Sequence, residues 1–229
     1  MSREWKRYER AHYRSGEQMA ADFRNQHGEN PSQTALSGTE RLTETRPFTE
    51  TEKEALRKDG AVILSTLGQT LSSQAEAQRQ AGKPSFSYMN CEDGYLMDIP
   101  SRLAQVAVYP DPDEFFAPKT NDKDLATQEI LIAKDAEKIR ARTGLQEIDE
   151  IIPDAATLTG IIFEYEKETG VWLLGRGFEN RFGRTKNGLV CFQHSNSPSL
   201  GLRVFSWPGD SHGDGVHAVR TVVPVVGKS

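Results

Sequence analysis

The spacing of apolar residues along the chain predicts three helices in its central part. Leucine and isoleucine recur at helical intervals over 50–81, which predicts one helix that is broken at Gly60. Thr49 and Glu52 stand three residues apart, as in a capping box, and mark its start. The folded part of the chain is therefore expected to begin at this helix.

The two following helices have clear start and stop signals. The stretch 124–144 places apolar residues on one face, gathers basic residues in its last turn and ends at Gly144, a typical position for a left-handed cap. Asp154 can cap a third helix, whose apolar stripe continues until Gly170. The caps at both ends make these two helices well defined in the sequence.

Short runs of β-branched and aromatic residues predict strands around the helices. These runs lie near 86–89, 94–98, 105–109, 147–152, 171–174, 188–194, 200–207 and 217–226. Strands and helices alternate between 105 and 174, which predicts crossover connections on one sheet. The predicted fold class is α+β: a mixed sheet with βαβ-type crossovers in the middle, and antiparallel strands at the C-terminal end that extend it or form a small sheet beside it. Pro224 indicates an edge or a bulge in the last strand.

A change in composition near residue 47 predicts two parts. Residues 1–47 are polar and predict an N-terminal arm, with a candidate helix over 2–26 that carries an aromatic stripe and is followed by a linker. This arm either stays frayed or docks as a helix on a partner or on the body. Residues 48–229 predict a single globular α+β domain.

Composition and charge exclude several classes of protein. The chain has 229 residues, a net charge of −5 and a pI near 5.6, which disfavours a protein that coats nucleic acid or an anionic membrane. Its two cysteines are too few for a disulfide scaffold. The charged N-terminus lacks the apolar stretch of a signal peptide, and no long apolar run follows. We therefore expect a soluble, cytoplasmic protein without a membrane partner.

A cluster of acidic and histidine residues near the end of the chain is a candidate metal site. Asp210, His212 and Asp214 alternate, so an extended chain would turn them to the same side. His217 has the opposite parity and joins them only if the glycines between them bend the chain. Oxygen and nitrogen ligands suit a divalent transition metal. The alternative is an ordinary hairpin loop, which uses the same Gly, Asp and Ser residues.

A basic and aromatic stretch is a candidate anion site. Within 175–188, the four residues Arg176, Arg181, Arg184 and Lys186 alternate with two phenylalanines and are flanked by glycines. Guanidinium groups beside aromatic rings in a mobile loop suit phosphate, a carboxylate partner or single-stranded nucleic acid. The alternative is a solvated surface loop that its phenylalanines anchor to the core.

The sequence offers little support for nucleophilic catalysis. Cys91 and Cys191 could meet a histidine such as His194 in space, and Ser195 and Ser211 each neighbour a histidine in the chain. No nucleophile elbow, phosphate loop or dinucleotide-binding pattern surrounds them. The acidic stretches YPDPDEFF and EIDEII are expected to be solvated.

These observations favour a binding function over an enzymatic one. The leading prediction is a non-enzymatic binding or protein-interaction module, whose partner is a protein or a small anionic ligand of unknown identity. One alternative is a metal-dependent hydrolase that uses the cluster at 210–217. The other is an anion or nucleic-acid binder that uses residues 176–186. No cofactor is predicted apart from the divalent metal of the first alternative.

Overall fold

The computed structural model describes most of the chain after residue 45. It covers residues 46–90, 97–174, 181–186, 189–193, 201–206, 210, 213 and 215–225. The predicted arm over 1–47, with its candidate helix at 2–26, lies outside these residues except for its last two positions. Within the described ranges, no helix combines the length and the hydrophobicity needed to cross a bilayer.

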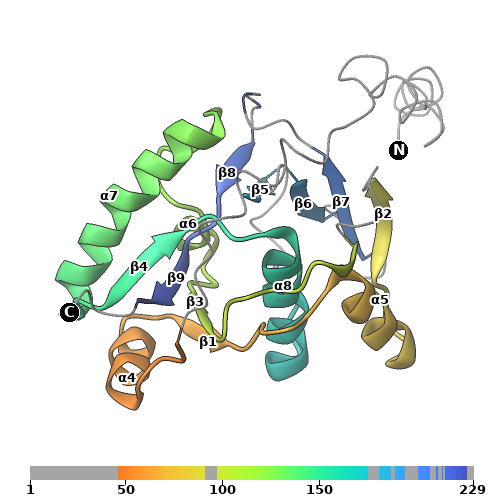
Figure 1. Cartoon of the computed structure of the whole chain (residues 1–229), viewed down its shortest axis with the longest axis horizontal. Coiled ribbons are helices and arrows are strands. Elements are labelled where there is room, and N and C mark those ends of the chain that lie inside the picture. Colours follow the sequence, from red (N-terminus) through yellow and green to blue (C-terminus); the bar gives the residue numbers. More distant parts are fainter. Residues whose placement is uncertain are drawn as a thin grey trace. The chain divides into compact units, whose positions relative to one another are not determined.

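Helices and two sheets together confirm the predicted α+β class (Figure 1). The first sheet has four strands in the order β1-β3-β9-β4, and every neighbouring pair is antiparallel. These strands are β1 (Val62–Leu64), β3 (Val106–Val108), β4 (Ile148–Ile151) and β9 (Thr221–Pro224). Because β3 and β4 are both antiparallel to β9, they are parallel to each other. The predicted crossover between them is therefore present, with β9 inserted in the middle.

The second sheet has five strands in the order β2-β7-β6-β5-β8. They are β2 (Phe86–Asn90), β5 (Phe182–Arg184), β6 (Leu189–Gln193), β7 (Leu202–Ser206) and β8 (Val216–Ala218). The pairs β6·β7 and β5·β6 are antiparallel, whereas β2·β7 and β5·β8 are parallel. The C-terminal strands β5 to β8 thus form a second sheet beside the first one, which was one of the two predicted arrangements. The last strand, β9, belongs to the first sheet.

Two helices begin at the capping residues that the sequence predicts, and two end at the predicted glycines. The capping box at Thr49 is present and opens α4 (Glu50–Lys58). Asp124 caps α7 (Leu125–Thr143), and Asp154 caps α8 (Ala155–Thr169). Gly144 and Gly170 close these two helices with φ angles of 75° and 71°. The two remaining helices are α5 (Leu71–Gln80) and the short α6 (Pro112–Phe115).

Several predicted elements differ from the structure. In the strand predicted over 94–98, the described residues Met97 and Asp98 have 3₁₀ conformation, and the one strand predicted over 217–226 is two strands, β8 and β9, in different sheets. The single helix over 50–81 is wrong, because the chain turns at Gly60, with φ of 99°, and forms β1 before α5 begins. The strand predicted over 171–174 is wrong as well, since these residues form a turn that buries Leu173 and Leu174 against the core. Finally, β9 is an inner strand and not the edge that Pro224 indicated. Pro224 is tolerated because its nitrogen faces the β3 side, where β3 has not yet begun, while Val225 N donates to Glu147 O on the other side.

Alternating residues of the first sheet belong to two different cores. Ala107, Ile148 and Val222 pack under α4 and α7 on one face. The residues of opposite parity, such as Val108 and Val223, pack with α8 in the main core. That main core also includes Leu202 and other residues of the second sheet, so one apolar cluster joins the two sheets.

Candidate functional site

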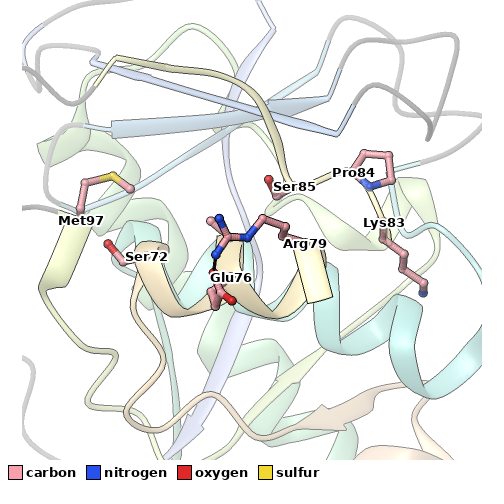
Figure 2. Close-up of a pocket in the computed structure, with 8 residues that line it drawn as sticks. Ser72, Glu76, Arg79, Lys83, Pro84, Ser85 and Met97 are labelled. Atoms are coloured by element: carbon pink, nitrogen blue, oxygen red, sulfur yellow. Dashed lines mark hydrogen bonds and ion pairs between the residues drawn. The ribbon is translucent and has the colours of Figure 1, made fainter. Parts of the chain in front are cut away.

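Two hollows flank helix α5. The first, which we call the α5–Met97 hollow, has a volume of about 600 Å³ (Figure 2). It is lined by Ser72, Ala75, Glu76, Arg79, Lys83, Pro84, Ser85 and Met97. The second, the α5–α8 hollow, has a volume of about 470 Å³ and is lined by Gln69, Ser73, Gln74, Ala77, Gln78, Ala81, Lys83, Phe163, Glu164 and Lys167. Both volumes fall in the range of small-molecule sites.

The sequence of α5 explains why hollows lie on both of its sides. Thr70 and Ser73 form a reciprocal cap that fixes the start of the helix, and the buried Leu71 anchors it to the core. Beyond Leu71, the residues that face the hollows include several with small side chains, such as Ala75 and Ala77. Such side chains hold the helix in place without filling the space beside it.

The polar wall of the α5–α8 hollow is held in a fixed arrangement. Gln74 donates through Nε2 to the carbonyl oxygen of Ala156, at 2.7 Å, and accepts a hydrogen bond from the Thr159 hydroxyl. Gln69 donates to Glu164 Oε1 at 2.9 Å. Gly160 of α8 lies against this wall, and a Cβ there would lie 2.5 Å from the Gln69 side-chain oxygen, so the Gln69 side chain would have to shift.

Gln78 lies one helical turn beyond Gln74 on the same wall. Its side chain is buried, and the side-chain oxygen Oε1 has no hydrogen-bond partner among the described residues. A buried acceptor without a donor costs free energy, on the order of 1–3 kcal/mol. Gln78 Oε1 is therefore a buried acceptor that no donor of the described residues satisfies.

The charged groups around the two hollows are paired. Lys167 Nζ lies 2.8 Å from Glu164 Oε2, and this hydrogen bond raises the pKa of the lysine. Lys83 extends away from Arg79 (Figure 2), and its Nζ lies 3.2 Å from a carboxylate oxygen of Glu166 in α8. Arg79 pairs with Glu76 on α5 itself. The walls therefore carry little net charge and favour an uncharged ligand over a free anion.

The predicted metal site lies partly outside the described residues. Asp210 is exposed, and His212 and Asp214 are not described. His217 is the middle residue of β8, where its ring packs on Phe116 with 4.8 Å between the ring centroids. No group of three metal-binding side chains occurs in the described part of the chain. The metal site therefore stays a prediction.

The predicted anion site is partly a strand and not a loop, because Phe182–Arg184 form β5. Arg181 donates to the carbonyl oxygen of Pro112 at 2.7 Å, and Lys186 Nζ lies 3.7 Å from a carboxylate oxygen of Glu129. Arg184 is 1% exposed and donates to the carbonyl oxygen of Lys123, and burial lowers the pKa of its guanidinium. These three side chains thus contact three different segments.

Most candidate nucleophiles lie outside the residues that the structure describes. This holds for Cys91, His194, Ser195 and Ser211, as it does for Arg176 of the anion site, and Cys191 is described only by its backbone in β6. The glutamines of the α5–α8 hollow were not among the predicted site residues. Their signal in the sequence is the i, i+4 spacing of Gln74 and Gln78, with two alanines between them. This spacing does not reveal which element packs against that face of the helix.

Comparisons with protein-family models, with curated proteins and with solved structures find no match to this chain. A function for the chain therefore has to be argued from its own sites and not from its fold.

Proposed function

We propose that this chain is a binding module and that the α5–α8 hollow is its ligand site. The observation that carries the proposal is the buried side-chain oxygen Oε1 of Gln78, which has no donor among the described residues, on a wall whose other amides are held in place. Among the described residues that line the two hollows there is no histidine, cysteine or aspartate, which favours binding over catalysis.

The lining indicates the kind of ligand. Phe163, Ala77 and Ala81 offer an apolar surface beside the glutamine wall, and the paired charges leave little net field. A fitting ligand is therefore small and uncharged, with one flat apolar face and an N–H or O–H group for Gln78. Carboxamides, cyclic ureas and pyrimidine bases have this character. This choice departs from the anionic ligand that the sequence suggested.

The proposal is tested by ligand-observed NMR with a panel of carboxamides, cyclic ureas, pyrimidine bases and free sugars. We expect at least one of these compounds to bind, and we expect Gln78→Met to weaken its binding about tenfold, because one hydrogen bond of roughly 1.4 kcal/mol is lost. The matched control is Gln80→Met, which changes an exposed glutamine of the same helix. A panel without any binder, or binders that are equally tight to Gln78→Met, would contradict the proposal.

A further inference from the structure

Glu150 occupies a position in β4 where the pattern requires an apolar residue. Ile148 and Ile152 have the same parity in the chain and are both buried under α7. Glu150 lies between them, is 3% exposed, and neither of its carboxylate oxygens has a hydrogen-bond partner among the described residues. The acidic stretch EIDEII was expected to be solvated, and for this residue the expectation is wrong.

The only buried positive charge described near Glu150 is already neutralised. Arg220, which precedes β9, donates from Nε and Nη2 to Oδ2 of Asp135 in α7 at 3.0 and 2.7 Å. Its Nη1 lies 3.3 Å from a carboxylate oxygen of Glu114. Asp135 also accepts from Lys138 at 3.0 Å. A second ionised carboxylate in this space would therefore be in excess.

The charged groups that act on Glu150 come from each element packed against it. They are Asp135 and Lys138 from α7, Asp149 from β4 itself and Arg220 from the segment before β9. Burial and, to a smaller extent, the charge of Asp135 raise the pKa of Glu150 to about 8, although Arg220 opposes both. The group therefore holds its proton at neutral pH and releases it under mildly alkaline conditions.

We propose that Glu150 is a proton-operated latch between α7 and the first sheet. With a neutral Glu150, the buried charges of Asp135 and Arg220 balance, and α7 packs on β4 through Ile139, Ile148 and the bond from Arg140 to the Ile148 carbonyl oxygen. When Glu150 loses its proton, the excess negative charge has to reach water, and the shortest way is to separate α7 from β4. The latch adds pH control to the fold, independently of any ligand in the α5–α8 hollow.

A carbon-13 NMR titration of the glutamate carboxyl groups tests the first step. We expect one carboxyl, missing from the spectrum of Glu150→Gln, to titrate near pH 8. If every glutamate titrates near its ordinary value of about 4.3, the latch does not exist. The titration itself is measured on the wild-type protein. If Glu150→Gln does not fold, Glu150→Met provides a second way to assign the Glu150 carboxyl signal.

Hydrogen exchange of the α7 amides tests the second step. Between about pH 6.5 and 9.5, and after correction for intrinsic exchange, we expect protection of α7 to fall at least about tenfold in the wild type and to stay constant in Glu150→Gln. The matched control is Asp149→Asn, which neutralises the neighbouring, half-exposed carboxylate. It should keep the fall in protection, shifted to lower pH because Asp149 helps to raise the pKa of Glu150. An equal loss of protection in the wild type and in Glu150→Gln would overturn the proposal.

Discussion

At the scale of single residues, the pair formed by Arg220 and Asp135 controls the space under α7. Their side chains are only 8% and 4% exposed. Replacing Asp135 by Asn leaves the buried Arg220 charge with only the half-exposed Glu114 carboxylate beside it, which we expect to lower the free energy of unfolding by up to about 3–5 kcal/mol. Urea denaturation measures this loss. Asp149→Asn removes a half-exposed carboxylate instead and should cost less than about 1 kcal/mol. Equal costs for the two variants would show that the buried pair is unimportant.

Glu150 predicts how stability depends on pH. Its pKa in the folded state is raised to about 8, whereas the unfolded chain has an ordinary value near 4.3. The folded state therefore keeps a proton that the unfolded state releases, and stability falls as the pH rises through this window. The slope is at most about 1.4 kcal/mol per pH unit. In urea denaturation from pH 4 to 9, the free energy of unfolding should fall less with pH in Glu150→Gln than in the wild type. The difference between the two proteins should stop growing at about pH 8. Parallel profiles would contradict the assignment.

Sequence alone could have found the position of Glu150 but not its burial. The alternation of EIDEII places Glu150 on the same side as Ile148, and this much is local. Its burial depends on α7 and on Arg220, which is 70 positions further along the chain and approaches only through the inserted strand β9. The burial of Arg184 was not predictable for the same reason, because its strand β5 lies between two partner strands, β6 and β8.

At the scale of elements, Gly201 controls where β7 meets β2. It has a φ of +72°, and a Cβ there would lie 2.4 Å from the Ser85 carbonyl oxygen, which accepts a hydrogen bond from Leu202 N. Gly201→Ala should therefore combine backbone strain with displacement of β2 and cost roughly 2–4 kcal/mol in thermal or urea unfolding. Gly170→Ala is the matched control, since its φ is +71° and it has nothing within 4 Å of the added Cβ. If the control loses as much stability, strain alone explains the result.

Elements with a local signal were predictable, and elements defined by partners were not. Helices α4, α7 and α8 are marked by caps such as Thr49 and Asp154, which act within one turn. The strand β1 has three residues between two helices, too few to show a period of two, and it exists because β3 pairs with it. The turn over 171–174 is apolar because it covers α8, so its composition resembled that of a strand.

At the scale of the whole described molecule, one core joins both sheets. The main cluster contains Leu64 and Val108 from the first sheet and Leu202 and Val204 from the second. We therefore expect Leu202→Ala to lower the free energy of unfolding by about 2–5 kcal/mol while unfolding stays a single transition. Far-ultraviolet circular dichroism and tryptophan fluorescence should give the same midpoint. Two separate midpoints would show that the sheets unfold independently.

The α5–α8 hollow shows the limit of reasoning from sequence at this scale. Its walls come from α5, from the turns before and after it and from α8, and Gly160 stands where the Gln69 side chain approaches α8. Hollows arise where side chains are small, so the residues that create them carry no chemical signal of their own. Binding at Gln78 could be proposed only after the partner surface was known.

The place of β9 in the first sheet has a consequence for biosynthesis. Strands β3 and β4 leave the ribosome long before β9, yet neither pairs with the other, because β9 lies between them. While a nascent chain extends only to β8, the first sheet lacks its inner strand. The unpaired edges of β3 and β4 are then accessible to chaperones and proteases. Folding of the first sheet should therefore be completed in one step, and only after residues 221–224 have left the ribosome and filled that gap.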